Sequence, residues 1–189
     1  MWYDFFKKGG IADMELFAAE MIPGMSGHET AYALLRHLLH RTRGIACPEI
    51  RRSENGKPYF VGRSDLFFSL SHTKTHVLVA LSEHEIGADI ETCRPVSVKL
   101  RDRLFTPEEQ EAFTFFEGWT LREAVFKLTG EGGLMTMPLK RTETEILTPF
   151  PGVRCRSYDC VPGCTAAVAC REGDFPEEIE IVPADAFLS

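Results

Sequence analysis

Apolar residues follow a helical period in one early stretch of the chain and a strand period in the stretches after it. Four leucines within residues 34–39 lie at helical spacing, Ser26 stands where an N-cap is expected, and Gly44 where a helix stops. The pattern therefore predicts a helix over residues 28–43. The turn signal Asn-Gly-Lys-Pro follows at residues 55–58. Short strands are predicted after it, at residues 59–61, 66–70, 77–81 and 86–90.

The apolar period becomes helical again in the second half. Thr106 and Pro107 combine an N-cap with a proline at the first helical position, which predicts a helix starting at Pro107. Gly118 predicts a break, followed by a second helix that ends near Thr129 before the glycine-rich loop 130–133. Strand character returns at residues 143–147, 153–158, 165–170 and 179–182. The order of helix and then strands occurs twice, and it favours an α+β fold.

Composition limits the class of protein. The chain has 189 residues, 44% hydrophobic and 26% charged, which suits one globular domain or two small fused lobes. Its apolar runs are shorter than the roughly 20 residues of a membrane span, and basic residues follow the apolar ones at residues 1–8, the reverse of a secretory signal. A net charge of -7 without a basic run argues against nucleic acid as a partner. We therefore expect a cytoplasmic protein.

The six cysteines do not predict a metal or disulfide framework. Four fall within residues 155–170, without a Cys-x-x-Cys pair or a histidine at ligand spacing. Free thiols that act as small apolar side chains are the simpler interpretation.

Paired acids close the last strand of the first half, in the sequence Gly87-Ala88-Asp89-Ile90-Glu91. Alternation along a strand places Asp89 and Glu91 on one face and Ile90 on the other. Two neighbouring carboxylates repel each other unless a cation or a proton lies between them, and Mg2+ commonly binds through such acids together with substrate phosphates. A solvated strand end is the alternative interpretation.

Two further segments carry candidate chemistry. On the helix 119–127, Glu123 and Lys127 share a face, a spacing that is also typical of an ordinary surface ion pair. Ser71 and His72 end an apolar strand; without a Gly-x-Ser-x-Gly turn they do not indicate a serine hydrolase. His72 is well placed to donate to a phosphate, with a purely structural role as the alternative.

Five segments in this order resemble the motifs of the surfactin-synthetase type of 4'-phosphopantetheinyl transferases, and the resemblance extends from about Arg36 to the end. The segments are residues 55–58, 68–72, 87–91, 105–109 and 119–127. The resemblance implies two similar α+β lobes in one chain, which we divide at residues 1–90 and 91–189, with coenzyme A and Mg2+ in the cleft between them. It also implies a monomer that acts on an apo acyl or peptidyl carrier protein.

By the same resemblance, particular residues receive roles. Asp89, Glu91 and Glu123 would bind the metal. The coenzyme A contacts would be Lys57, Ser71, His72, Lys127 and Arg36, with His72 toward the 3'-phosphate. The proton acceptor would be either Glu123 or a water held by Glu109, and the sequence does not separate them. Arg122 stands where many relatives have lysine; a guanidinium does not release its proton, so a phosphate clamp is the role left to it.

Two other classes of function share part of this pattern. A coenzyme A or carrier-protein binding module without catalysis would keep the cleft but would not need Asp89, Glu91 and Glu123. An unrelated Mg2+-dependent phosphohydrolase would use the paired acids equally well.

Overall fold

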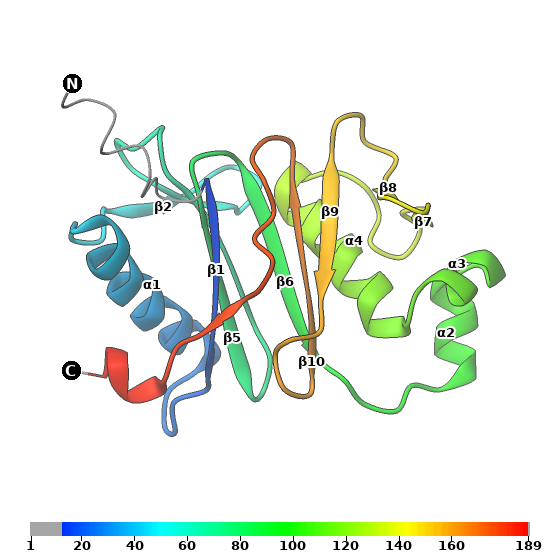
Figure 1. Ribbon diagram of the computed structural model, residues 1–189, viewed down its shortest axis with the longest axis horizontal. Helices are drawn as coiled ribbons and strands as arrows, with labels where there is room; N and C mark the ends of the chain where they lie inside the picture. Colours follow the sequence, from blue (N-terminus) through cyan, green and yellow to red (C-terminus); the bar gives the residue numbers. More distant parts are fainter. Residues whose placement is uncertain (1–12, 189) are drawn as a thin grey trace.

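The computed structural model describes residues 13–188 (Figure 1). The N-terminal residues used in the argument about location lie outside this part. The strands are β1 (Met14–Glu20), β2 (Ile50–Arg52), β3 (Pro58–Phe60), β4 (Phe67–His72), β5 (His76–Ser82), β6 (Ile86–Thr92), β7 (Lys140–Arg141), β8 (Ile146–Leu147), β9 (Arg154–Tyr158), β10 (Cys164–Cys170) and β11 (Glu180–Ile181). The helices are α1 (Gly27–Arg43), α2 (Val98–Leu104), α3 (Pro107–Ala112), α4 (Phe115–Thr129) and a short 3-10 helix, Ala184–Phe187.

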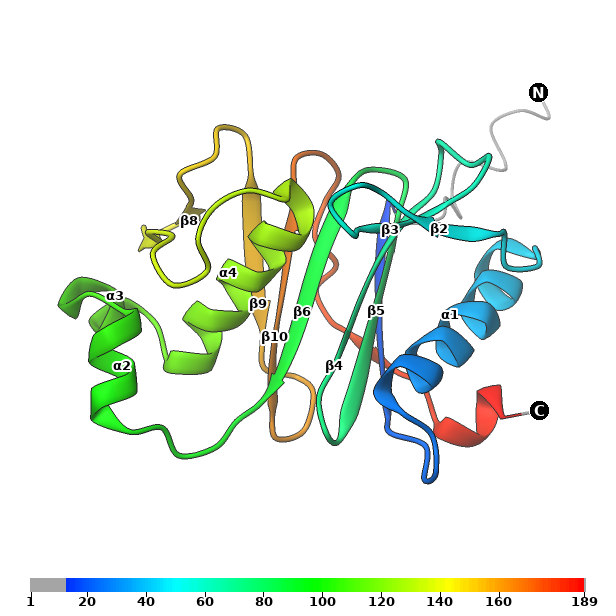
Figure 2. The ribbon, with the colours of Figure 1, turned by 180° about the vertical axis from the view of Figure 1, so that it is seen from behind.

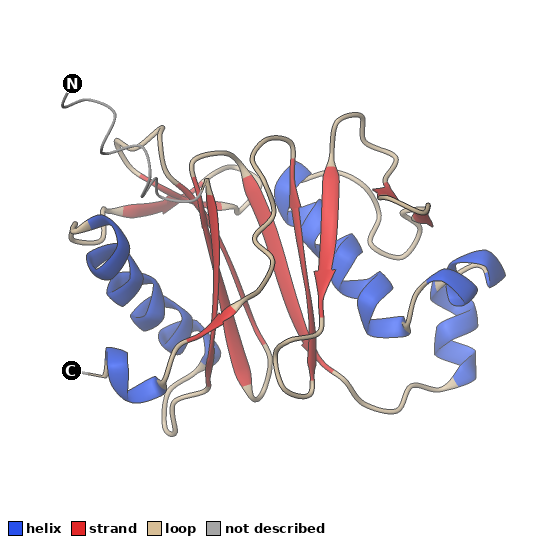
Figure 3. Cartoon of the chain, viewed as in Figure 1, coloured by secondary structure: helices blue, strands red, loops and turns tan. Residues whose placement is uncertain are grey.

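The elements form four layers, with two sheets between two helices (Figures 1 and 3). One sheet has the order β11-β1-β5-β4 and the other β6-β10-β9. The first sheet packs on α1 through one apolar cluster, the second packs on α4 through another, and a third cluster fills the space between the sheets. This α+β arrangement confirms the fold class expected from the sequence.

Alternation along β6 explains how this strand serves two layers. Ile86, Ala88 and Ile90 belong to the cluster between the sheets. The residues between them therefore face α4, which packs against the other side of the strand (Figure 2). The expected placement of Ile90 in the core, opposite Asp89 and Glu91, is confirmed.

The predicted elements are largely observed. Helix α1 has Ser26 as its N-cap, in a capping box, and Gly44 in the left-handed conformation as its C-cap. Helix α3 begins at Pro107 with Thr106 as its cap, as expected. The predicted break at Gly118 is wrong. Helix α4 begins at Phe115 and continues through Gly118, where the absence of a side chain lets the ring of Phe105 pack on the helix backbone.

Two elements were not predicted. Six of the seven residues of β1 are buried or half-buried, so the strand lacks the polar–apolar alternation that marks a strand with one solvated face. Helix α2 buries only Leu104, so it lacks the apolar stripe of a packed helix.

The end of the chain returns to the first lobe. Strand β11 pairs in parallel with β1, and Val182 and Phe187 join the cluster beneath α1. The division at residues 90 and 91 stays a prediction, and the path of the chain shows that residues 180–187 pack on the first sheet.

Two sequence expectations concern thiols and membranes. All six cysteines are free, and Cys155, Cys164 and Cys170 are buried, as expected for small apolar side chains. Within residues 13–188, none of the helices is both long enough and apolar enough to span a bilayer.

Candidate active site

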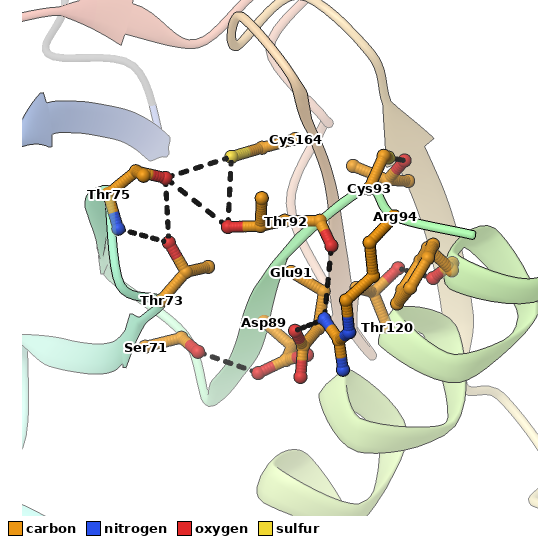
Figure 4. Close-up of polar contacts among 12 residues, drawn as sticks. Ser71, Thr73, Thr75, Asp89, Glu91, Thr92, Cys93, Arg94, Thr120 and Cys164 are labelled. Atoms are coloured by element: carbon orange, nitrogen blue, oxygen red, sulfur yellow. Dashed lines mark hydrogen bonds and ion pairs between the residues drawn. The ribbon is translucent and has the colours of Figure 1, made fainter. Parts of the chain in front are cut away.

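The two sheets meet where β4 runs beside β6, and serine side chains join them. The Ser69 hydroxyl accepts from the Ala88 N–H at 2.9 Å. The Ser71 hydroxyl donates to Asp89 Oδ1 at 2.6 Å (Figure 4). Alternate residues of β4 thus reach the strand that carries the paired acids.

Asp89 is 6% exposed, and its two carboxylate oxygens differ. Oδ1 accepts from Ser71 and, at 2.7 Å, from Lys127 Nζ. Oδ2 is buried and has no hydrogen-bond partner within residues 13–188. A buried carboxylate oxygen without a partner carries a desolvation cost that a cation or a donor would remove.

Glu91 is half-buried at the open end of the same face. Its carboxylate lies 3.5 Å from the guanidinium of Arg94 (Figure 4). The Arg94 side chain is exposed, and its guanidinium also lies over the ring of Phe116. Because an exposed pair of this length contributes little energy, Arg94 can leave Glu91 at small cost.

Gly87 allows α4 to pack directly on β6. A Cβ atom at this position would lie 2.1 Å from the carbonyl oxygen of Ala124 and 2.5 Å from the backbone nitrogen of Leu128. Glycine is thus required for the helix to approach closely enough for Glu123 and Lys127 to face Asp89.

The pKa of Glu123 is affected by its burial and by the neighbouring charged groups. Burial raises the pKa of Glu123, the negative charge of Asp89 raises it further, Lys127 lowers it, and Glu91 adds a smaller increase. Burial and the neighbouring acids together therefore outweigh Lys127 in setting the pKa of Glu123.

The acids fit a divalent cation in charge and donor type. Within residues 13–188, no three His, Cys, Asp or Glu side chains form a ready metal-binding group as they stand. A bound cation would give the unpartnered oxygen of Asp89 a ligand and would offset the effects that raise the pKa of Glu123, and carboxylates are the ligands Mg2+ prefers.

A cavity of about 750 Å3 opens beside the acids. It lies between the N-terminal part of α1, the β2–β3 hairpin, β4 and the end of α4. Its charged and imidazole side chains are His28, Arg52, Lys57, Arg63, His72, Glu85 and Lys127. Its walls include the aromatic residues Tyr32, Tyr59, Phe60, Phe67, Phe68 and Phe126. Lys127 lines the cavity and bonds to Asp89, so this lysine links the cavity to the acids, which do not themselves line it.

Lys57 and His72 both line this cavity and contact different helices. Lys57 Nζ donates to the carbonyl oxygen of Leu128, at the end of α4, at 3.2 Å. Burial lowers the pKa of Lys57, and Glu85 partly offsets the effect. His72 is exposed and its ring lies against Gly27, at the first turn of α1, where an added Cβ would lie 2.5 Å from the ring.

The structure separates Ser71 and Arg36 from the predicted cavity contacts. Ser71 does not line the cavity and instead donates to Asp89. Arg36 is exposed and does not line it either.

Several cavity residues were missed by the sequence analysis. Arg52 and Arg63 flank the predicted turn at residues 55–58, and His28 and Tyr32 lie one turn apart on the predicted helix. Basic residues on both sides of a hairpin turn, and aromatic rings four residues apart at a helix start, were the available signals.

Glu109 and Arg122 lie apart from the acids and bind each other. Arg122 Nη2 donates to Glu109 Oε1 at 2.8 Å, and the side chains are 2% and 5% exposed. The other Glu109 oxygen accepts from the Thr106 N–H. Neither the water-holding role of Glu109 nor the phosphate-clamp role of Arg122 fits these contacts, because the charged groups are already paired and buried.

Comparison with known proteins adds independent information. The sequence model of the 4'-phosphopantetheinyl transferase superfamily matches residues 85–154, which include the paired acids and all of α4.

Curated relatives match over most of the chain. The 4'-phosphopantetheinyl transferase psf-1 of Bacillus pumilus is 29% identical over 177 residues, covering 82% of this chain and 76% of that protein. The transferase Sfp of Bacillus subtilis (strain 168) is 28% identical, covering 82% and 78%. The transferase HetI of Nostoc sp. is 32% identical over 163 residues, covering 72% and 67%. The chain belongs to the 4'-phosphopantetheinyl transferase superfamily and is a transferase of this type.

Proposed function

We propose that the protein transfers the 4'-phosphopantetheine group of coenzyme A to a serine of an apo acyl or peptidyl carrier protein and releases adenosine 3',5'-bisphosphate. The observation that carries this proposal is Lys127, which lines the cavity and bonds to Asp89. A molecule with an aromatic base at one end and a diphosphate in its middle would extend from the cavity to the acids.

The charges of the cavity support an anionic ligand. The chain carries a net charge of -7, yet Arg52, Lys57, Arg63 and Lys127 line one cavity, together with the single acid Glu85. Arg63 is paired with Asp65 and Lys127 with Asp89. A concave cluster of positive charge in an acidic protein attracts anions locally. The phosphates of coenzyme A meet this requirement, and the aromatic walls suit its adenine ring.

Asp89, Glu91 and Glu123 are the residues we propose to hold Mg2+. When bound, Mg2+ would supply positive charge against the negative charge that develops on the diphosphate during transfer. Lys127 adds a fixed positive charge at the same place, and Ser71 holds the Asp89 carboxylate in position.

In the reaction, the hydroxyl oxygen of the carrier serine forms a bond to the β-phosphorus of coenzyme A. The bond from that phosphorus to the bridging oxygen breaks, and adenosine 3',5'-bisphosphate leaves with the electron pair. The serine proton requires an acceptor, and both oxygens of Glu109 already accept hydrogen bonds in a buried pair. The acceptor we propose is Glu123, through a carboxylate oxygen that does not bind Mg2+, because a carboxylate oxygen bound to the ion is a poor base.

The carrier protein requires a docking surface, and we propose α2 for it. Val98 is 73% and Leu100 42% exposed. Lys99 and Arg103 are exposed on the same short helix, so α2 joins apolar and basic side chains. An acidic carrier, repelled at long range by the net charge of the enzyme, would be attracted at this place.

One experiment separates the three candidate functions. The protein is incubated with coenzyme A, Mg2+ and an apo carrier domain, and the carrier is then weighed intact. A transferase adds the phosphopantetheine mass, a binding module adds nothing, and a phosphohydrolase degrades coenzyme A without changing the carrier. An unmodified carrier would contradict the proposal. The cytoplasmic location and the monomeric state remain parts of this proposal, the latter because both lobes of the cleft lie in one chain.

A further inference from the structure

Arg122 is the largest fully buried side chain among the residues that the structure describes, at 1% exposure. Its Nη1 donates to the carbonyl oxygen of Leu104, the last residue of α2, at 2.6 Å. Its Nη2 pairs with Glu109, and its guanidinium lies 4.3 Å from the ring centre of Phe105. One side chain on α4 therefore contacts the end of α2, the residue after it and the helix α3.

Glu109 extends these contacts to a second segment. Its Oε1 also accepts from the Leu139 N–H at 3.0 Å, and its Oε2 accepts from the Thr106 N–H at 2.9 Å. The Arg122–Glu109 pair therefore fixes four parts of the chain: α4, the end of α2, the start of α3 and the segment before β7.

Helices α2 and α3 have few other buried contacts. Leu104 is the buried residue of α2 and Glu109 the buried residue of α3. Figures 1 and 2 show both helices at the edge of the molecule, beyond the first turns of α4 and away from the sheets. The buried ion pair is thus one of the main contacts that hold α2 and α3 against α4, together with the buried rings of Phe105 and Phe113.

A buried ion pair is seldom the most stable way to fill a core, because removing two charges from water costs about as much as their attraction returns. What a guanidinium does provide is direction, since its planar donors fix the angle of each acceptor. Arg122 donates from Nη1 and Nη2, while its Nε is buried without a hydrogen-bond partner among the residues that the structure describes. Placed between α4 and α2, this pair fixes position more than it adds stability.

We propose that Arg122 is a positioning residue that sets α2, as the carrier-docking helix, at a fixed place relative to Glu123. Arg122 and Glu123 are consecutive on α4, so their side chains leave the helix about 100° apart. One points to α2 and α3 and the other to the acids. This inference rests on the proposed function, because it assigns Arg122 to carrier use and leaves the coenzyme A cavity to other residues.

The experiment compares Arg122→Met, Arg122→Lys and Glu109→Gln with Arg51→Met, which removes an exposed arginine from β2. Hydrogen exchange without substrates reports on the attachment itself. We expect the amides of residues 98–112 in Arg122→Met to exchange at least about tenfold faster, with β5 and β10 unchanged, since a local opening follows loss of the anchor. The proposal would be overturned if exchange became faster throughout the chain, or if the exchange of residues 98–112 did not become faster.

Kinetics supply the second readout. Arg122→Met should raise KM for the carrier at least about tenfold, with the affinity for coenzyme A changed by less than about twofold. Arg122→Lys keeps the charge but lacks the planar fork, so it should fall between the wild type and Arg122→Met. Equal losses toward carrier and coenzyme A, or an unchanged carrier KM, would overturn the proposal. Should Arg122→Met fail to fold, Arg122→Lys and Glu109→Gln give the same comparison.

The two proposals fail in different ways. If the wild-type protein does not modify the carrier, the proposed function is wrong, and the carrier-docking role of Arg122 is wrong with it. If the wild type transfers the group and the carrier KM of the Arg122 variants does not change, only the inference about Arg122 is wrong.

Discussion

The Ser71 hydroxyl donates to Asp89 Oδ1 at 2.6 Å and so joins β4 of the first sheet to β6 of the second. With Lys127 on the same oxygen, this bond leaves Oδ2 as the oxygen free to bind a cation. The acid is therefore oriented by both sheets and by α4. Its position depends on the packing between the lobes, which makes Asp89 the most informative residue to change.

Asp89→Ala should abolish transfer without unfolding the chain. The variant removes the negative charge proposed to bind Mg2+, and losses of an electrostatic contact at a reacting centre are about 100-fold to 1000-fold in rate. Asp89→Asn keeps an acceptor for Ser71 and Lys127, so it should lose activity while melting close to the wild type. Intact mass of the carrier measures the activity, and Asp159→Asn, an exposed change, is the control. Full activity of Asp89→Ala in magnesium buffer would remove the metal assignment.

Gly87→Ala should lower both stability and activity. The added methyl group meets backbone atoms of α4 at 2.1 and 2.5 Å, which cannot rotate away, so helix and strand must separate. Overpacking of this kind costs about 1–3 kcal/mol. Gly133→Ala is the matched control, because its added Cβ meets only the Thr136 hydroxyl. Urea unfolding compares the two, and equal stability of both variants would contradict the close approach of α4.

A feature of the fold or the site could be predicted from the sequence where its physical cause lies in neighbouring residues. The caps of α1 and the turn at Gly56 are local, and both were predicted. The shared face of Asp89 and Glu91 follows from strand alternation alone. The proximity of Glu123 to these acids depends on Gly87, whose meaning appears only when α4 is packed on it.

Other parts required the tertiary structure. Gly118 has the sequence signature of a helix break, yet tertiary packing against Phe105 keeps it helical. Arg122 and Glu109 are 13 residues apart, and polar side chains in a sequence do not reveal that they are buried as a pair. The cavity residue Arg52 ends β2 and Arg63 follows β3, and no local pattern indicates where this hairpin lies relative to α4.

His72→Ala should weaken coenzyme A more than its 3'-dephospho form. The exposed ring lies at the first turn of α1, where backbone N–H groups and a protonated imidazole would both favour a phosphate. A lost charge-assisted contact corresponds to about tenfold weaker binding. Gly27→Ala should give the same preference, because its methyl group displaces the His72 ring. Calorimetry with both ligands is the test, and equal losses would count against this contact.

The basic face of α2 should matter to the carrier and not to coenzyme A. Reversing Lys99 and Arg103 to glutamate would place negative charge opposite an acidic carrier, and rim charges of this type act mainly on the association rate. We expect carrier KM to rise about tenfold and to become less dependent on salt, with coenzyme A binding unchanged. Lys140→Glu, an exposed reversal on β7, is the control. A similar rise for the control would indicate net charge as the cause.

The pKa of Glu109 predicts how stability changes in acid. Burial raises this pKa, but the hydrogen bonds from Thr106, Leu139 and Arg122 outweigh burial, and the pKa lies below its usual value of 4.5. Because the folded pKa is the lower one, ionised Glu109 stabilises the fold fully above about pH 4.5, and the contribution is lost as the pH falls through the folded pKa.

Glu109→Gln isolates that contribution. At neutral pH it leaves Arg122 without its counter-charge in a buried place, which should cost about 3–5 kcal/mol of unfolding free energy. The difference between wild type and variant should stay constant from neutral pH down to about pH 4.5 and narrow below it, as wild-type Glu109 takes up a proton while the pH falls toward its folded pKa. Urea unfolding across this range measures it, with Glu178→Gln, an exposed change, as the control. A difference that stays constant or widens in acid would show that the Glu109 carboxylate does not stabilise the fold through its charge.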